Sequence, residues 1–182
     1  MIQAIGLVEF SSIAKGIEAA DAMLKASRIE LLEARPVCPG KYIVLIWGEV
    51  SAVYNSVQAG NSIGKDSVVD DFVIPNVHPE VIEAISGATN VGEIDAIGVI
   101  ESFSIATLIV AADSAVKAGA VQLIEVRIGT GIGGKSFVTL TGDVGDVTAS
   151  VNVGRNTCAE KGMHLESVVI PSPHKALKDH IL

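Results

Sequence analysis

The chain has 182 residues, of which 49% are hydrophobic, 4% aromatic and 19% charged, and its formal net charge is −8 at pH 7. Because the charge is acidic and no basic cluster could neutralise a row of phosphates, we expect no nucleic acid partner. The longest apolar runs, such as 42–47 and 105–112, fall well short of the roughly 18 residues that a membrane span needs, and the first residues carry no export signal. We therefore expect a cytoplasmic protein with no membrane partner.

Hydrophobic periodicity predicts seven elements in the first half of the chain. In order they are a strand at 5–10, a helix from Ser12 to about Ser27, strands at 29–37 and 42–47, a helix at about 50–60, a strand at 68–74 and a short helix from Pro79. Ser12 is a suitable N-cap, and proline is favoured in the first helical turn. The order β-α-β-β-α-β-α indicates an α/β (α+β) fold of ferredoxin-like, split βαβ type, with an antiparallel sheet and helices on one side.

The second half of the chain repeats the first. Residues 4–9, Ala-Ile-Gly-Leu-Val-Glu, match residues 96–101, Ala-Ile-Gly-Val-Ile-Glu, and later matches pair Gly40-Lys41 with Gly134-Lys135. About half of the positions between 4 and 60 are identical to their counterparts. We interpret the chain as a tandem duplication of one module, with domains at 1–91 and 92–182.

A glycine-rich stretch at 129–136 fits the phosphate-binding pattern G-x-x-x-x-G-K-S. That pattern binds phosphate only where the loop opens a helix whose first amides face the ligand. Here residues 137–142 are β-branched and strand-like, and the first copy has only Cys-Pro-Gly-Lys at the equivalent place. We therefore favour a glycine-rich hairpin loop over a nucleotide hydrolase, which would have to bind ATP measurably.

The two cysteines have different surroundings. Cys38 lies in a tight turn between two strands, whereas Cys158 lies in a helical stretch where a small, half-buried residue is expected. One cysteine cannot hold a metal centre, but three chains meeting at this turn would bring three thiolates together, one fewer than iron-sulfur clusters usually take. No histidine and cysteine share a zinc-ligand spacing, and no catalytic constellation is evident, so we expect no enzyme.

The opening Ala-Ile-Gly-Leu-Val-Glu, the helix end from Asp21 to Ala26, the glycine-lysine turn and the Ile-Pro-x-x-His segments at 74–78 and 170–174 resemble the bacterial microcompartment shell domain. The resemblance occurs twice and covers nearly the whole chain. It implies homotrimers that imitate hexamers and tile, together with other shell proteins, into a shell around enzymes that handle volatile aldehydes. Encapsulated redox enzymes would be further partners, and the location would be the shell of a cytoplasmic microcompartment.

Within this family, the turn at 37–41 resembles the pore loop of a tandem shell protein of propanediol-utilisation compartments. The resemblance implies that Cys38 binds a [4Fe-4S] cluster shared by three chains on the threefold axis, suited to electron transfer or cluster exchange across the shell. It also implies a pore lined by two groups of residues, Val37, Pro39 and Gly40 from the turn and Thr130, Gly131, Ile132, Gly133 and Gly134 from the second copy. Lys25 and Lys117 match the lysine at tile edges, whereas Asn76 and Ser172 stand where many shell proteins have arginine.

Two other readings remain open at this level. The chain could be a plain shell tile, with a pore that passes metabolites and with Cys38 free of metal. It could also be a ferredoxin-like regulator that binds a small molecule and stays a discrete soluble oligomer. Iron content separates the first reading from the cluster reading, and sheets or tubes in electron micrographs would exclude the second.

Overall fold

A computed structural model describes residues 4–129, 131–178, 180 and 181. The chain divides into two compact units, each with its own four-stranded sheet. The first unit runs to Val77 and includes the loop Gly129–Gly134, and the second comprises His78–Ile128 and the residues from Lys135 onward. None of the helices in the described residues is long and apolar enough to cross a membrane.

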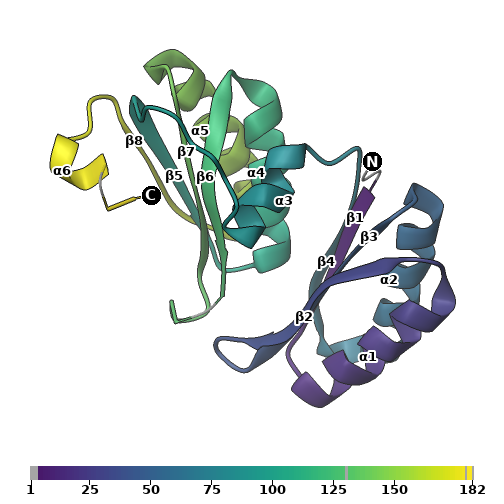
Figure 1. The fold of residues 1–182 in the computed structure, drawn as a ribbon. Helices are drawn as coiled ribbons and strands as arrows, with labels where there is room; N and C mark the ends of the chain where they lie inside the picture. The colour runs from purple at the N-terminus through teal and green to yellow at the C-terminus, as the bar shows by residue number, and fades with distance from the viewer. Residues whose placement is uncertain (1–3, 130, 179, 182) are drawn as a thin grey trace. The chain divides into compact units, whose positions relative to one another are not determined.

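The first unit contains four strands, two α-helices and one short 3-10 helix (Figure 1). In chain order they are β1 (Ala4–Phe10), α1 (Ile13–Ala26), β2 (Glu30–Val37), β3 (Lys41–Gly48), α2 (Val50–Gly64), η1 (Lys65–Ser67) and β4 (Val68–Pro75). The strand order is β2-β3-β1-β4 and every neighbouring pair is antiparallel. Ser12 caps α1 as predicted, because its hydroxyl accepts the backbone N–H of Lys15.

The second unit repeats this arrangement, with the strand order β6-β7-β5-β8 and antiparallel pairing throughout. Its elements are α3 (Pro79–Ser86), β5 (Ala96–Ser102), α4 (Ile105–Ala118), β6 (Val121–Ile128), β7 (Ser136–Gly142), α5 (Val144–Glu160), β8 (His164–Ile170) and α6 (Lys175–Lys178). The predicted fold class, two tandem split-βαβ domains with antiparallel sheets, is confirmed. The strand predicted after the glycine loop is also present, as β7.

Both helices of the first unit cover one face of its sheet, and glycines allow the close approach. A Cβ on Gly6 of β1 would lie 2.7 Å from side-chain atoms of Val53 and Val57 on α2. A Cβ on Gly60 would lie 2.7 Å from the sulfur of Met23 on α1. Gly60 was predicted to end the second helix, but α2 continues to Gly64, because this glycine serves helix packing rather than helix termination.

The cores of the two units differ by a compensated exchange of side-chain volume. In the first unit Phe10 is fully buried, and a Cβ on Gly64 would lie only 2.5 Å from its ring. At the equivalent positions the second unit has Ser102 and Cys158, both fully buried, with a hydrogen bond between their side chains. In the first unit the largest side chain of the pair, Phe10, therefore faces glycine, whereas in the second unit two small side chains, Ser102 and Cys158, face each other.

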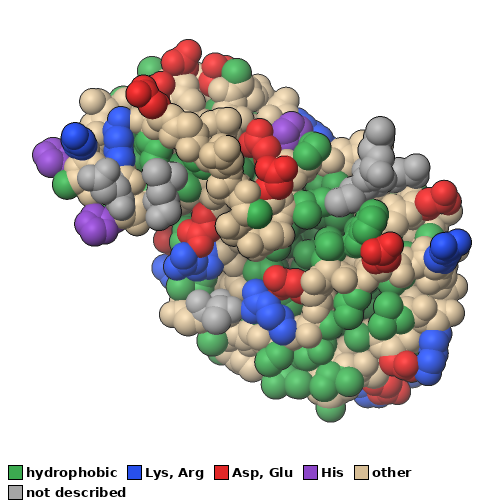
Figure 2. Space-filling view, in the orientation of Figure 1, with side chains coloured by type: hydrophobic (Ala, Val, Ile, Leu, Met, Phe, Trp, Pro, Cys, Tyr) green, Lys and Arg blue, Asp and Glu red, His purple; other side chains and the backbone are tan. Residues whose placement is uncertain are grey.

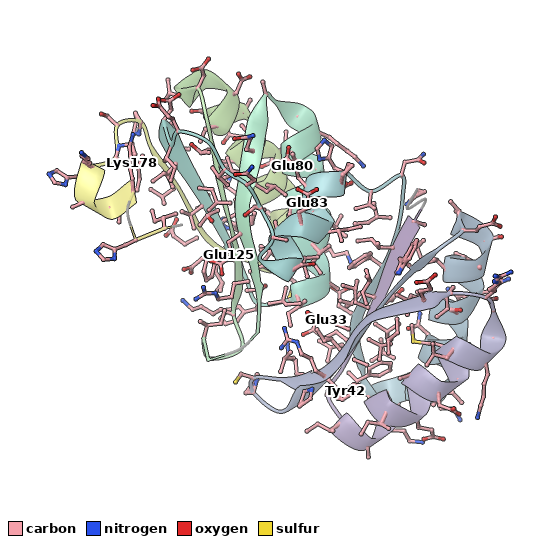
Figure 3. All side chains as sticks on the ribbon, in the orientation of Figure 1. Glu33, Tyr42, Glu80, Glu83, Glu125 and Lys178 are labelled. Carbon is pink, nitrogen blue, oxygen red and sulfur yellow. The ribbon has the colours of Figure 1, made fainter. Side chains whose placement is uncertain are left out.

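Helix α3 belongs to the first copy in sequence but packs in the second unit. The backbone N–H of His78 donates to Asp113 on α4 at 2.8 Å, and the backbone N–H of Leu123 on β6 donates to Glu80 at 2.8 Å. Figure 3 shows Glu80 and Glu83 on this short helix. The first compact unit therefore ends at Val77 in this part of the chain, whereas the boundary predicted from the sequence repeat lies between residues 91 and 92.

Candidate functional site

Cys38 lies in a tight turn that joins β2 to β3. The backbone N–H of Gly40 donates to the carbonyl of Val37 at 3.0 Å, and the Cys38–Pro39 peptide is cis, as in type VI turns. Gly40 has a φ of +87°, a conformation that favours glycine. Val37 is buried, Cys38 is half-buried, and Pro39 and Gly40 are exposed. The turn thus places the Cys38 thiol beside surface residues rather than in a packed core.

The glycine loop of the second copy lies against this turn, inside the first unit. The backbone N–H of Cys38 donates to the carbonyl of Gly129 at 2.7 Å, and a Cβ on Gly134 would lie 2.6 Å from Cδ of Pro39. Gly131 and Gly133 are exposed and Ile132 is half-buried. The two groups of predicted pore residues are thereby brought together, except Thr130, which lies outside the described residues.

An ion pair holds the strand that leaves the turn. Nζ of Lys41 lies 2.7 Å from the carboxylate of Glu9, whose side chain is fully buried. The second unit repeats this pair with Lys135 and Glu101 at 3.3 Å, although both side chains are more exposed there. The matched glycine-lysine turns found in the sequence thus have matched partners on β1 and β5.

Cys158 lies in α5 and differs from Cys38 in burial. It is fully buried, not half-buried as predicted, since it fills the space beside Ser102. Burial raises the pKa of its thiol from 9.0 to about 11, and the hydrogen bond with Ser102 offsets only part of that effect. Because the thiolate is the metal ligand, Cys158 is unsuited to bind iron.

A single chain does not supply the ligands of an iron-sulfur cluster. Among the residues that the structure describes, no group of three or more His, Cys, Asp or Glu side chains could hold a metal ion. A [4Fe-4S] cluster usually takes four cysteine ligands. Cys38, at a half-exposed turn, fits such a cluster only if equivalent chains each contribute one thiolate.

The two predicted edge lysines lie in the last turns of equivalent helices but differ in exposure. Lys25 on α1 pairs with Asp21 at 2.5 Å, and both side chains are largely exposed. Lys117 on α4 pairs with Asp113 at 2.6 Å, where the carboxylate is almost buried. Asp113 also accepts the N–H of His78, a second role that was not recognised in the sequence because it depends on α3 reaching α4.

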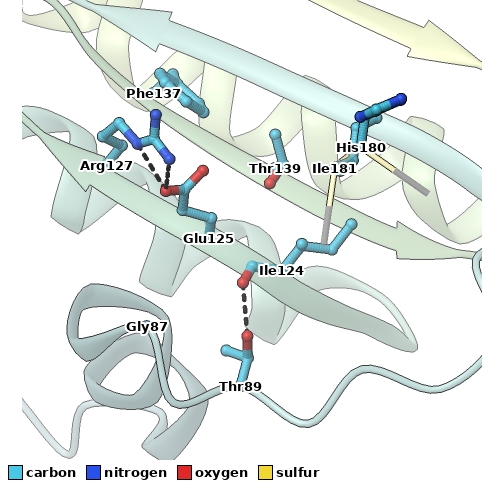
Figure 4. Close-up of a pocket in the computed structure, with 9 residues that line it drawn as sticks. All are labelled: Gly87, Thr89, Ile124, Glu125, Arg127, Phe137, Thr139, His180 and Ile181. Carbon is cyan, nitrogen blue, oxygen red and sulfur yellow. Dashed lines mark hydrogen bonds and ion pairs between the residues drawn. The ribbon is translucent and has the colours of Figure 1, made fainter. Parts of the chain in front are cut away.

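A hollow of about 430 Å³ lies on the sheet of the second unit (Figure 4). It is lined by Ile124, Glu125, Phe137 and Thr139 from β6 and β7, among others. Arg127 pairs with Glu125 at 2.5 Å, and its guanidinium lies 5.5 Å from the centre of the Phe137 ring. Because its two charges neutralise each other, the hollow offers a mixed surface rather than a charged binding site.

Comparison with known proteins finds the same domain in both halves. The BMC domain family matches residues 4–77 and again residues 96–173. The bacterial microcompartment shell protein PduT of Citrobacter freundii is 45% identical over 177 residues, which cover 97% of this chain and 96% of that protein. The carboxysome shell protein CsoS1 of Prochlorococcus marinus is 35% identical over 96 residues, or 50% of this chain and 92% of that protein.

A solved structure gives the same likeness in three dimensions. A microcompartment protein from Desulfitobacterium hafniense superimposes with a TM-score of 0.89 at 62% sequence identity, covering 98% of this chain and 99% of that one. The likeness therefore extends over both units and the segment that connects them.

Proposed function

This chain belongs to the BMC-domain family of microcompartment shell proteins, as its sequence resemblance predicted, and from that membership we propose that three copies close into a pseudohexameric tile of the shell. A ring of six modules needs three chains when each chain carries two. Proteins of this kind are structural, and we assign this chain no reaction. Its location would be the shell of a compartment in the bacterial cytoplasm, beside other shell proteins and, inside, encapsulated redox enzymes.

The observation that supports the ring is an apolar face of α1 that is left open within the first unit. On α1, the side chains of Ile13, Ile17 and Leu24 are 42%, 55% and 44% exposed. Figure 2 shows hydrophobic side chains gathered on the lower surface, where Figure 1 places α1. These three apolar side chains are therefore available for contact with a partner.

A second copy of the chain is the partner that this open face fits. Covering the remaining half of each α1 side chain would contribute roughly 1 kcal/mol per residue at each contact. A contact between an α1 face and a different surface on the next copy is heterologous, and such contacts close into rings when the rotation allows.

We further propose that Cys38 of each of three chains binds one [4Fe-4S] cluster at the ring axis. The half-exposed turn supports this proposal, and the buried, high-pKa thiol of Cys158 argues that no other cysteine serves. Three thiolates would leave one iron without a protein ligand. When bound, the cluster would transfer single electrons across the shell, or would itself be exchanged there.

A plain shell tile with a metabolite pore is the second candidate. It needs nothing of Cys38 beyond the half-exposed thiol that the structure shows. In that case Cys38 would be a surface thiol beside the opening.

Two measurements test these proposals separately. Electron microscopy of the purified protein should show sheets or tubes, and discrete soluble particles at all concentrations would count against a shell tile. Iron and sulfide analysis with EPR on anaerobically purified protein should give a cluster that Cys38→Ser abolishes and that Cys158→Ser retains. A Cys38→Ser protein with full iron content would refute the cluster site and leave the tile standing.

A further inference from the structure

We propose that the loop Gly129–Gly134 is a clamp that fixes the backbone of the Cys38 turn and thereby orients its thiol. The turn has one closing hydrogen bond of its own, from Gly40 to Val37, and Pro39 has no N–H to donate. The N–H of Cys38 instead donates to Gly129, at 2.7 Å. The residue that carries the thiol is therefore held by the second copy of the module and not by its own hairpin.

Gly134 makes the second contact of the clamp. It is buried, its φ is +83°, and a Cβ there would lie 2.6 Å from Cδ of Pro39 and 3.5 Å from the carbonyl oxygen of Cys38. Real Cβ atoms essentially never approach another atom to 2.6 Å, so only glycine lets the loop backbone lie this close to Pro39. Gly133 is the contrasting neighbour, since it has a φ of +64° but nothing within 4 Å of a Cβ.

The difference in loop length between the copies is consistent with this role. Three residues, 38–40, join β2 to β3, whereas seven, 129–135, join β6 to β7. The longer loop contacts the turn from both of its ends, at Gly129 and at Gly134. The second copy has no cysteine at this place. Its loop instead holds the backbone of the turn in the first copy, which carries the proposed ligand Cys38.

Such a clamp matters because metal ligands must be held within about 0.5 Å of their working geometry. In this respect the inference rests on the proposed function: where three chains share one cluster, each thiol must be directed by its own chain. The clamp itself is a property of the backbone, so it can be tested with or without iron.

The test compares Gly134→Ala with the matched control Gly133→Ala in iron-free protein. Both variants place an alanine at positive φ, but only the methyl group at 134 meets Pro39. We expect iodoacetamide to alkylate Cys38 at least about threefold faster in Gly134→Ala than in wild type, because a displaced loop frees the turn, and at the wild-type rate in Gly133→Ala. Cys158 does not interfere, since it is buried. Equal rates in the two variants would overturn the clamp.

Amide hydrogen exchange gives a second measurement that needs no variant to fold well. In wild-type protein the Cys38 amide should exchange at least about tenfold more slowly than an open turn amide of the same sequence. An unprotected Cys38 amide would overturn the proposal. In iron-loaded protein a chelator should remove iron faster from Gly134→Ala than from Gly133→Ala. If wild type and both variants bind no iron, the proposed cluster is refuted. The alkylation rates and the exchange of the Cys38 amide still test whether the loop fixes the turn.

Discussion

The exchanged core residues of the two units can be tested by moving one pair into the other unit. The perturbation is Phe10→Ser with Gly64→Cys, which gives the first unit the residues of the second. Phe10 is fully buried, so its truncation alone should cost about 3–5 kcal/mol in the free energy of unfolding. Gly64→Cys alone should cost about 1–3 kcal/mol, because its Cβ would lie 2.5 Å from Phe10 and 2.7 Å from Val68.

The double variant should be more stable than the sum of these losses predicts. Once the ring is gone, the cysteine fills part of its space and can bond the new hydroxyl, as Cys158 does with Ser102. We expect a coupling free energy of about 1–3 kcal/mol. The assay is urea unfolding followed by circular dichroism at one fixed chain concentration, because assembly also stabilises the folded state.

A control pairs Phe10→Ser with Gly98→Ala, which overpacks the second unit against Val151 at 2.6 Å. Those two losses should simply add. If the losses of Phe10→Ser and Gly64→Cys also add to within about 0.5 kcal/mol, the compensation between these positions is refuted.

Three further predictions concern the surface and the buried charges. Lys25→Asp with Lys117→Gln should leave trimers intact and stop sheet formation in electron micrographs, because both lysines are expected at tile edges and glutamine can still donate to the almost buried Asp113; unchanged sheets would contradict that place. Asp113→Ala should lower the free energy of unfolding by about 2–3 kcal/mol, since it loses the His78 and Lys117 contacts, whereas Asp21→Ala on the exposed equivalent should stay within about 0.5 kcal/mol. The pKa of Cys158 is raised from 9.0 to about 11 in the folded state, so its contribution to the free energy of unfolding should be intact below pH 9 and fall by up to about 2–3 kcal/mol between pH 9 and 11. Cys158→Ala should lack this part of the alkaline decline. A pH profile identical to that of wild type would argue against the raised pKa.

Strands and helices could be predicted because they depend on local patterns, and the duplication could be predicted because the same residues recur in the second half of the chain. The unbroken apolar run at 42–47 and the cap at Ser12 each act within a few positions of the chain. The end of α2 could not be predicted in this way, because Gly60 looks like a helix terminus in sequence and proves to be a contact with Met23. The packing role of Gly60 depends on α1 lying against α2, which the sequence does not specify locally.

The candidate site was predictable in part for the same reason. Proline and glycine beside Cys38 place it in a turn, which is a local property. The contacts of that turn with Gly129 and Gly134 join residues some 90 positions apart and leave no periodic signal. The attachment of α3 through His78 and Glu80 is likewise nonlocal, so the repeat boundary and the boundary of the compact units differ.

The central claim, a three-chain tile around one cluster, is tested most directly by the native mass of the anaerobically purified protein. Three chains of 18.8 kDa should appear together at about 56 kDa. The same assembly should carry an additional mass of about 0.35 kDa for four irons and four sulfides. A stable monomer or dimer would contradict the ring, and a trimer without the additional mass would contradict the cluster.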